Sequence, residues 1–440
     1  MKIAVIGGGS TYTPELIEGF ARRTDRLHVD ELVLHDVSTE RLTVVGGLAG
    51  RILAKQGFGG ALRTTTSLDE AVDGAAAVLI QLRVGGQAAR LVDETLPNKF
   101  HLLGQETTGP GGFAKALRTV PVVLAIADTV RKRSQPGAWI VDFTNPVGIM
   151  TRALLDEGHR ALGLCNVAIG FQRRFAARLG IDASRVRLDH VGLNHLSWIR
   201  RVLVDGVDIL PDMLARDTVE EIAESVEMPA ELMRTIGAIP SYYLRYFYRT
   251  DDALHEQETG EHRAQQVLQI EKTLLDMYAD PTLDHKPELL EKRGGAYYSE
   301  AAAALVTSLL TGDGAHHYVD LRNNGTIAGL PDEAVVEVPA HVDREGAHPV
   351  HVAPLAPEML GLVQAVTAYE VLTIQAARSG DRGTALRALL ANPLVRQWDV
   401  AVPLLDALLE ANRAHLPAFS VSPGGRDDAA GLTQNREARG

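Results

Sequence analysis

The sequence predicts an α/β fold in which an N-terminal, doubly wound parallel sheet is followed by a C-terminal α+β lobe. Strand-like and helix-like segments alternate over the first 165 residues, and a glycine-rich turn follows the first strand. The alternation stops after about residue 185, where a long apolar stretch and then mostly helical segments begin. We therefore expect one domain over 1–165, a second over 166–421, and a disordered polar tail over 422–440.

Short apolar runs bounded by turn residues mark the strands of the predicted sheet. These strands are expected at 2–7, 31–36, 61–66, 77–82, 139–144 and 161–164. Apolar residues at helical spacing predict helices at 14–23, 39–55, 86–98 and 113–133. Farther along, the expected elements are a long strand or hairpin at 185–206, helices over most of 213–310, alternating strands within 315–350, and helices over 355–416.

Composition limits the classes of partner. The 440 residues carry a formal net charge of −12, which argues against binding to nucleic acid, although a few arginines can still form a local pocket for a phosphorylated small molecule. We expect no membrane span and no signal peptide, because no long apolar run is present and the N-terminus leads directly into glycine. Cys165 is the single cysteine, so no internal disulfide can form, and this fits a reducing cytoplasm.

A dinucleotide site is predicted at the first strand-to-helix turn. Gly7 and Gly9 follow a strand and precede a helix, where the backbone amides of the turn, including those of Ser10 and Thr11, can bind a pyrophosphate. Asp36 ends the second strand, where its carboxylate would accept hydrogen bonds from the ribose hydroxyls and favour NAD over NADP. The competing interpretation is a glycine turn of some other α/β protein. If the site is real, residues 1–165 form a Rossmann-like NAD-binding domain.

A thiol and an imidazole could hold a metal ion near that cofactor. Cys165 and His195 lie at the ends of two apolar, strand-like stretches, and each has an asparagine beside it. Ligands gather outside the carboxyl ends of strands in an open parallel sheet. The competing interpretation is an inert core cysteine and an unrelated histidine. The mixed donor set leaves the metal open among Mn, Fe, Co, Ni and Zn.

Other polar segments follow strands of the same sheet or interrupt the helical lobe. Arg83 follows the fourth strand, a glycine-rich loop is expected over 104–112, and Asn145 follows the fifth strand. Each is also explained by ordinary loop or cap chemistry. Tyrosines are dense over 240–248, and such a run more often forms a packing face than a catalytic site. Arg263 lies where a helix is expected to begin and is also explained as an exposed arginine that forms salt bridges. Arg293 is either a phosphate ligand or a surface charge.

Taken together, these segments resemble the family 4 glycoside hydrolases from Met1 to about residue 416. The matching segments are Ile6-Gly7-Gly8-Gly9-Ser10-Thr11-Tyr12-Thr13-Pro14, Arg83-Val84-Gly85-Gly86, Gly104-Gln105-Glu106-Thr107, Gly109-Pro110-Gly111-Gly112, Thr144-Asn145-Pro146, Cys165-Asn166-Val167, Gly192-Leu193-Asn194-His195 and Tyr243-Leu244-Arg245-Tyr246. The resemblance implies a fold of the lactate/malate dehydrogenase type, NAD, a divalent metal that is usually manganese, and an oxidative route to glycoside cleavage. It also implies a homodimer or homotetramer, with substrate, metal and oligomer contacts in 166–421.

The resemblance assigns roles to single residues. It implies that Cys165 and His195 hold the metal, that Tyr243 is the catalytic base and that Lys99 sharpens this tyrosine. Substrate-binding positions of the family match Arg83, Asn145 and Arg263. Asn166 occupies the position that varies with substrate type, and Cys165-Asn166-Val167 is similar to the 6-phospho-β-glucosidases; this chain has Ala168 where that group has proline.

The leading hypothesis is a 6-phospho-β-glucosidase that acts on sugars such as cellobiose 6-phosphate. It works by NAD-dependent oxidation at C3, metal-assisted deprotonation at C2, elimination and addition of water. The alternatives are an NAD-dependent dehydrogenase of the lactate/malate type, a family 4 hydrolase of α-linked or unphosphorylated substrates, and a non-catalytic NAD-binding sensor. The dehydrogenase and the sensor explain Gly7, Gly9 and Asp36 but leave Cys165, His195 and Tyr243 unexplained together.

Overall fold

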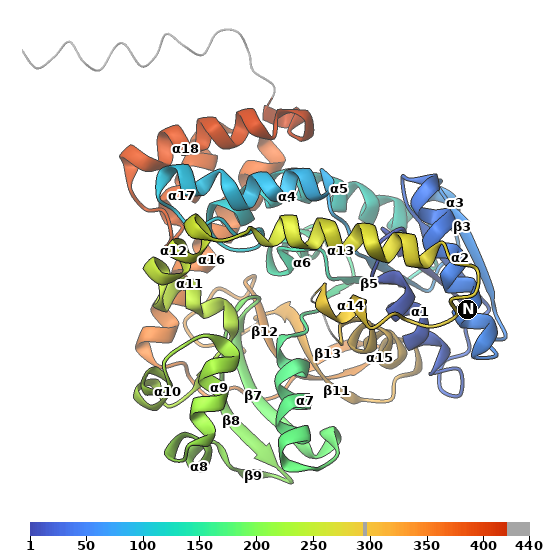
Figure 1. Cartoon of the computed structure of the whole chain (residues 1–440), viewed down its shortest axis with the longest axis horizontal. Helices are drawn as coiled ribbons and strands as arrows, with labels where there is room; N and C mark the ends of the chain where they lie inside the picture. The colour runs from blue at the N-terminus through green and yellow to red at the C-terminus, as the bar shows by residue number, and fades with distance from the viewer. Residues whose placement is uncertain (294–296, 420–440) are drawn as a thin grey trace, which may run out of the picture.

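A single mixed sheet runs through the molecule and joins its two halves (Figure 1). The computed structural model describes residues 1–293 and 297–419, so the expected tail at 422–440 lies outside the described residues. The sheet has the strand order β10-β8-β7-β12-β11-β6-β5-β4-β1-β2-β3, with β13 paired to β12 and β9 paired to β8. The strands are β1 Lys2–Ile6, β2 Glu31–His35, β3 Ala61–Thr65, β4 Ala77–Ile80, β5 Trp139–Asp142, β6 Ala161–Gly163, β7 Val186–Leu193, β8 Leu196–Val204, β9 Val207–Asp208, β10 Ile239–Pro240, β11 Ala315–Arg322, β12 Val335–Asp343 and β13 Gly346–Pro349.

The six strands from β6 to β3 are parallel and form the predicted Rossmann-like half. β1 pairs with β2 on one side and with β4 on the other, so the chain reverses its direction of winding beside β1. A crevice for a ligand is expected at such a switch point, outside the carboxyl ends of the strands. The remaining pairs are antiparallel, beginning where β11 meets β6. The predicted doubly wound sheet with an α+β lobe is thereby confirmed, while the division at residue 165 stays a prediction.

Two sets of helices cover the sheet, and each includes helices from both ends of the chain. One set packs around α1, α2 and α15, and the other around α5, α6 and α16. The helices of the first half are α1 Thr13–Ala21, α2 Thr39–Lys55, α3 Leu68–Val72, α4 Gly86–Thr95, η1 Pro97–Phe100, α5 Gly109–Arg133, α6 Val147–Asp156 and α7 Val167–Leu179. Those of the second half are η2 Ala183–Arg185, α8 Leu210–Ala215, α9 Thr218–Val226, α10 Ala230–Ile236, η3 Tyr242–Leu244, α11 Arg245–Tyr248, α12 Thr250–Thr259, α13 Arg263–Tyr278, α14 Leu289–Lys292, α15 Tyr298–Thr311, α16 Pro357–Ser379, α17 Arg382–Ala391, α18 Trp398–Ala411, η4 Arg413–His415 and η5 Pro417–Phe419.

The expected strand or hairpin at 185–206 is a hairpin of β7 and β8. Leu193 pairs with Leu196, which leaves Asn194 and His195 as its two-residue turn. His195 has a φ of 61°, in the left-handed region that few non-glycine residues occupy. The turn thus carries the predicted imidazole ligand at a position fixed by the strand register.

The start of α5 differs from the sequence prediction. The helix begins at Gly109, whereas the glycine-rich loop was expected to continue to residue 112. Glycine is a poor helix former, so the prediction placed these residues in a loop. A Cβ at Gly111 would lie 2.3 Å from the carbonyl oxygen of Gln105, and one at Gly112 would lie 2.5 Å from the carbonyl carbon of Thr107. These glycines therefore allow close packing of the loop 104–108 on the helix.

Proline explains the second difference. The helix expected at 86–98 ends at Thr95, and the separate turn η1 follows from Pro97. Proline has no N–H to donate and disfavours helical geometry in the residue before it.

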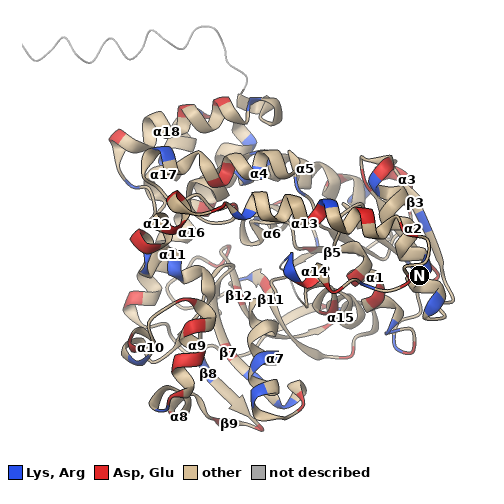
Figure 2. Cartoon of the chain, viewed as in Figure 1, with Lys and Arg blue, Asp and Glu red and all other residues tan. Residues whose placement is uncertain are grey.

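Apolar side chains of the described residues are buried in two large clusters and two small ones, and charged side chains pair on the outside. In Figure 2 the ribbons of neighbouring helices carry both basic and acidic positions, and Arg178 of α7 forms an ion pair with Glu221 of α9. Among the described helices, α16 is long and apolar enough to cross a membrane by length and composition. Half of its most apolar stretch is buried, and it packs against α5, α6 and α17, as core helices do.

Candidate functional site

Every predicted site residue of the first half that follows a parallel strand lies at the same edge of the sheet. Gly7 follows β1, Asp36 follows β2, Arg83 lies beyond β4, Asn145 lies beyond β5 and Cys165 lies beyond β6. The carboxyl ends of parallel strands share one edge, so the sheet gathers these residues around the switch point.

The glycine-rich turn is built for close approach of the backbone. Gly7 has a φ of 86°, and a Cβ there would lie 2.3 Å from the carbonyl oxygen of Gln81. A Cβ at Gly9 would lie 2.8 Å from Oδ2 of Asp36. Ser10 accepts a hydrogen bond from the Tyr12 amide, and the buried hydroxyl of Thr11 has no hydrogen-bond partner within the described residues. The turn therefore offers a glycine-lined cradle for close approach of a pyrophosphate, and an unpaired hydroxyl lies within the same segment.

Asp36 ties this turn to the second strand. Its Oδ2 accepts a hydrogen bond from the Gly9 amide at 3.0 Å, and its Oδ1 accepts one from the Ser38 amide at 3.0 Å. Each carboxylate oxygen has a second lone pair, so Asp36 retains the capacity to bind ribose hydroxyls. The carboxylate thus has a structural role in addition to the predicted cofactor contact.

Helix α13 of the second half packs against α4 and α2 of the first half (Figure 1). The Tyr278 hydroxyl donates to the Thr11 carbonyl at 2.8 Å. Arg293 lies over the ring of Tyr12 at 4.0 Å and forms a buried ion pair with Glu271. Of the two alternatives for Arg293, the surface charge is wrong, because the turn and α13 enclose its guanidinium.

Cys165, His195 and Tyr243 come together, although 78 residues separate the first from the last. The rings of His195 and Tyr243 stack with centroids 3.6 Å apart and planes 13° apart. Cys165 lies close enough that its charge raises the pKa of Tyr243. The thiol and the imidazole are both buried, with 3% and 4% of their residue surfaces exposed.

Burial dominates the protonation of this cluster. It raises the pKa of the Cys165 thiol, and the charges of Glu337 and Asp320 raise it further. It lowers the pKa of His195 to about 4, so the imidazole is neutral at physiological pH. Burial, Cys165 and Glu106 also raise the pKa of Tyr243. A cation placed among these groups would reverse the trend for the thiol and the phenol, since positive charge favours their anionic forms.

Each candidate metal ligand has a hydroxyl partner that the sequence analysis did not identify. Thr107 lies 2.9 Å from Nδ1 of His195, and a hydrogen bond with Tyr298 opposes the raised pKa of Cys165. Thr107 lies in one of the segments that carry the family resemblance, but the resemblance assigned no role to it. No local pattern marks Tyr298, which reaches the thiol from the start of α15.

A buried glutamate supports the turn that carries His195. Glu337 of β12 accepts a hydrogen bond from Asn194 at 3.1 Å and lies 2.5 Å from Nε2 of His190. Both Glu337 and His190 are 1% or less exposed. Sequence reasoning missed Glu337 because its partners are distant in sequence and its strand reads as ordinary core.

Glu106 is the centre of a buried charge cluster that was also missed. Its carboxylate pairs with Arg83, with Lys115 at 2.7 Å and with Arg90 at 3.4 Å. Burial alone would raise the pKa of Glu106, but Arg83, Lys115 and Arg90 hold it well below its usual range. Burial lowers the pKa of Lys115 to about 8 against the opposing charge of Glu106. The cluster fixes Arg83 beside the loop 104–108.

The remaining predicted residues have different surroundings. Oδ1 of Asn145 is buried without a hydrogen-bond partner within the described residues, which fits a group that awaits a ligand. Asn166 caps the start of α7, and Ala168 lies in the first turn of that helix, where proline and alanine are both tolerated. Arg263 begins α13 with an exposed side chain that donates to the Lys292 carbonyl at 2.7 Å.

Lys99 is not brought to Tyr243 by any hydrogen bond among the described residues. Its side chain is exposed on η1. The cation with the strongest influence on the pKa of Tyr243 is Arg90, which lowers it. The structure therefore gives no support to the expected influence of Lys99 on Tyr243, because water screens the charge of an exposed ammonium.

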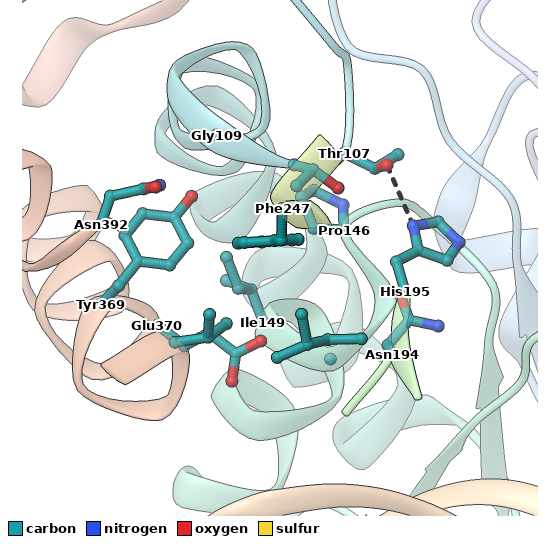
Figure 3. Close-up of a pocket in the computed structure, with 14 residues that line it drawn as sticks. Thr107, Gly109, Pro146, Ile149, Asn194, His195, Phe247, Tyr369, Glu370 and Asn392 are labelled. Atoms are coloured by element: carbon teal, nitrogen blue, oxygen red, sulfur yellow. Dashed lines mark hydrogen bonds between the residues drawn. The ribbon is translucent and has the colours of Figure 1, made fainter. Parts of the chain in front are cut away.

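A pocket adjoins the cluster on the side of Asn194 and His195 (Figure 3). Its walls come from the starts of α5 and α6, from α16 and from Phe247. Burial raises the pKa of Glu370 in this wall to about 8, with Arg152 opposing. Cys165 and Tyr243 are not among the lining residues, so the pocket borders the candidate site and does not contain it.

The residues present fit both implied groups. The glycine cradle with the free Thr11 hydroxyl fits a dinucleotide, and the thiol and imidazole fit a borderline-soft divalent metal. Among the described residues, no group of three or more His, Cys, Asp and Glu side chains is arranged to hold a metal ion. A metal held by Cys165 and His195 would take its other ligands from substrate oxygens and water.

Comparison with known proteins identifies the family. A model described as family 4 glycosyl hydrolase matches residues 2–181, and one described as the C-terminal domain of this family matches residues 190–395. A probable 6-phospho-beta-glucosidase of Bacillus subtilis is 41% identical, covering 95% of this chain and 98% of its own length. A maltose-6'-phosphate glucosidase of the same organism is 27% identical over 96% of this chain and 98% of its own length.

Solved structures agree in fold. The 6-phospho-beta glucosidase from Thermotoga maritima, determined with manganese, NAD+ and glucose-6-phosphate, superimposes with a TM-score of 0.87 at 37% identity, covering 94% of this chain and 99% of its own. Malate dehydrogenase from Salinibacter ruber shares the fold with a TM-score of 0.55 at 16% identity, covering 86% and 99% of the two chains. The predicted dehydrogenase-type fold is thereby confirmed, and the chain belongs to glycosyl hydrolase family 4.

Proposed function

We propose that this protein is a 6-phospho-β-glucosidase that hydrolyses 6-phosphorylated β-glucosides such as cellobiose 6-phosphate. The observation that carries the proposal is the buried cluster of Cys165, His195 and Tyr243. The higher identity to the relative named for β-linked substrates, compared with the relative named for maltose 6'-phosphate, supports the β specificity. Asn166 supports it as well.

The chemistry requires two bound groups. When bound, NAD supplies a reversible hydride acceptor for C3 of the sugar, and a divalent metal, most simply Mn²⁺, supplies positive charge at the C2 and C3 oxygens. Cys165 and His195 would hold the metal, and Gly7, Gly9, Ser10, Thr11 and Asp36 would hold the dinucleotide. Oxidation at C3 makes the neighbouring C2–H acidic.

Tyr243 is then placed to act as the base. Its phenolate takes the C2 proton, and the C1–oxygen bond to the leaving group breaks as water gives a proton to the leaving oxygen. Water adds at C1, Tyr243 returns a proton to C2, and the hydride returns to C3, so NAD is regenerated. The raised pKa of Tyr243 in the protein alone means that the phenolate forms only when a cation is close. We assign Arg83, Asn145, Asn166 and Arg263 to the sugar phosphate and hydroxyls.

The test is hydrolysis of p-nitrophenyl β-D-glucoside 6-phosphate and of its α-linked and unphosphorylated counterparts, each with and without NAD⁺ and Mn²⁺. We expect release of p-nitrophenol from the β-linked phosphorylated substrate only when both additions are present. In D₂O, deuterium should appear at C2 of the product. Steady accumulation of NADH without p-nitrophenol would instead favour a dehydrogenase of the lactate/malate type.

Two further properties belong to the proposal. A reducing, cytoplasmic location fits a site whose single thiol must stay unoxidised to bind a metal. A homodimer or homotetramer is expected, and light scattering on the purified protein measures it directly.

A further inference from the structure

We propose that Gln105, acting through the hydroxyl of Thr107, fixes the tautomer of His195 so that its Nε2 carries the free lone pair. The inference deepens the proposed function, because it explains how the protein presents one imidazole nitrogen to a divalent metal. Thr107 and Gln105 are positioning residues in this scheme. Neither needs to touch substrate or cofactor.

The first step identifies which atom of the Gln105 side chain faces Thr107. The backbone amides of Thr107 and Thr108 lie 2.5 and 2.7 Å from the same side-chain atom of Gln105. A backbone amide can only donate a hydrogen bond, so this atom must be an acceptor. The side-chain NH₂ of glutamine cannot accept, and the atom is therefore the carbonyl oxygen Oε1.

The Thr107 hydroxyl has a single proton, and its two neighbours determine where that proton points. Oγ1 of Thr107 lies 2.7 Å from Oε1 of Gln105. Because Oε1 has no proton, the hydroxyl must donate its own proton to form this bond. Nδ1 of His195 lies 2.9 Å from the same Oγ1, and the hydroxyl can present only a lone pair to it. Nδ1 of His195 must be the donor, and it therefore carries the proton.

The third step is the consequence for the ring. A metal-binding imidazole is neutral and has one proton, so protonation at Nδ1 leaves Nε2 as the acceptor. The stack on Tyr243, with centroids 3.6 Å apart, holds the plane of the ring. The hairpin turn at φ 61° and the bond from Asn194 to Glu337 hold its backbone. Position, plane and tautomer are thus fixed by three separate sets of contacts.

The tautomer is measured first, on metal-free full-length protein with ¹⁵N-labelled histidine. Long-range ¹H–¹⁵N spectra distinguish the two protonated nitrogens, and the signals that vanish in His195→Asn assign the residue. We expect protonated Nδ1 in the wild type and in Thr107→Ser, and a shift toward protonated Nε2 in Thr107→Val. Protonated Nε2 in the wild type, or an unchanged spectrum in Thr107→Val, would overturn the proposal.

Metal affinity is the second readout. Free Mn²⁺ is titrated by electron paramagnetic resonance in the presence of NAD⁺. Thr107→Val should weaken Mn²⁺ binding about 10- to 100-fold, as expected when an outer partner of a metal ligand is lost. Gln105→Leu should act in the same direction, and Thr107→Ser should retain wild-type affinity. NAD⁺ affinity should stay unchanged in all three variants.

A matched control and a separate failure mode complete the design. Thr43→Val makes the same replacement on the exposed side of α2 and should leave both readouts unchanged. Equal weakening in Thr43→Val and Thr107→Val would contradict the specific role of Thr107. If the wild type binds no Mn²⁺, the proposed metal site fails, while the metal-free spectrum still decides the tautomer.

Discussion

The glycine-rich turn and the buried cluster around His195 are built in opposite ways. The turn is contiguous, running from Gly7 to Thr13, and its shape is enforced by glycines that no other residue could replace without a clash. The cluster draws on Thr107, Cys165, His195 and Tyr243, which only the folded chain brings together. Close packing of the backbone therefore shapes the first site, whereas side-chain contacts between residues remote in sequence shape the second.

This difference predicts where a substitution acts. Changes in the cluster should affect chemistry or the stability of the whole fold, because its members are buried and depend on one another. Changes in the turn should affect cofactor affinity and local strain.

The largest effect is expected for Tyr243→Phe. The phenylalanine ring keeps the stack on His195 but lacks the hydroxyl that we propose takes the C2 proton. General base catalysis contributes about 10²- to 10⁴-fold, so kcat should fall by that factor. NAD⁺ and Mn²⁺ binding should stay near wild type, as checked by titration. Full activity, with deuterium still entering C2 from D₂O, would exclude Tyr243 as the base.

Glu106→Gln should have the largest effect on stability. The substitution removes the counter-charge that Arg83, Arg90 and Lys115 share, and two of these, Arg90 and Lys115, are buried. Breaking a buried ion pair costs about 3–5 kcal/mol, which urea unfolding would measure as a lower midpoint. The matched control is Glu221→Gln on exposed α9, which should cost less than about 1 kcal/mol. Equal losses of stability in the two variants would contradict the view that Glu106 neutralises buried positive charge.

In the glycine-rich turn, Gly7→Ala should lower the free energy of unfolding by about 2–4 kcal/mol, because it adds both positive-φ strain and overpacking. The added Cβ would lie 2.3 Å from the Gln81 carbonyl oxygen at a φ of 86°. Gly86→Ala is the control, since it shares a positive φ of 63° but meets no atom within 4 Å. We expect thermal melting to show the larger loss for Gly7→Ala, together with weaker NAD⁺ binding. A larger loss for Gly86→Ala would show that crowding at the turn is unimportant.

Asp36→Ala should have a smaller effect, which combines weaker cofactor binding with loss of the two amide bonds that hold the turn. It removes the acceptor for the Gly9 amide and the proposed contact to the ribose hydroxyls. We expect NAD⁺ affinity to fall about tenfold and the preference for NAD⁺ over NADP⁺ to shrink, because the repelling charge is lost. Fluorescence titration with both cofactors measures this. Asp25→Ala, at an exposed position beyond α1, should change neither affinity.

The same contrast explains what sequence reasoning achieved. The parallel strands, the glycine turn and the position of Asp36 follow from local patterns, and the structure places them as predicted. The ends of helices were less predictable, because Gly109 to Gly112 are helical for reasons of packing that only the folded loop shows. Cys165, His195 and Tyr243 could be named from the family resemblance, but their stacking could not.

Residues that act through other residues were the hardest to predict. Glu337, Tyr298 and Lys115 lie in segments that read as ordinary strand or helix, and their partners are remote in sequence. A buried charge is visible in a sequence only when its counter-charge can be located. Glu106 lay within a recognised segment, yet its three cations come from positions that no spacing rule connects.

Lys99→Ala gives the smallest expected effect and separates the family resemblance from the geometry. The resemblance assigns Lys99 to Tyr243, whereas the structure exposes its ammonium and gives Arg90 the strongest cationic influence on that tyrosine. An exposed charge is screened by water and salt, so we expect kcat/KM to change less than about twofold at moderate ionic strength. Arg90→Gln provides the contrast, since it also removes the pair with Glu94 and should lower activity more strongly. A loss of tenfold or more in Lys99→Ala, growing at low salt, would return Lys99 to the tyrosine and show that the side chain moves inward when substrate binds.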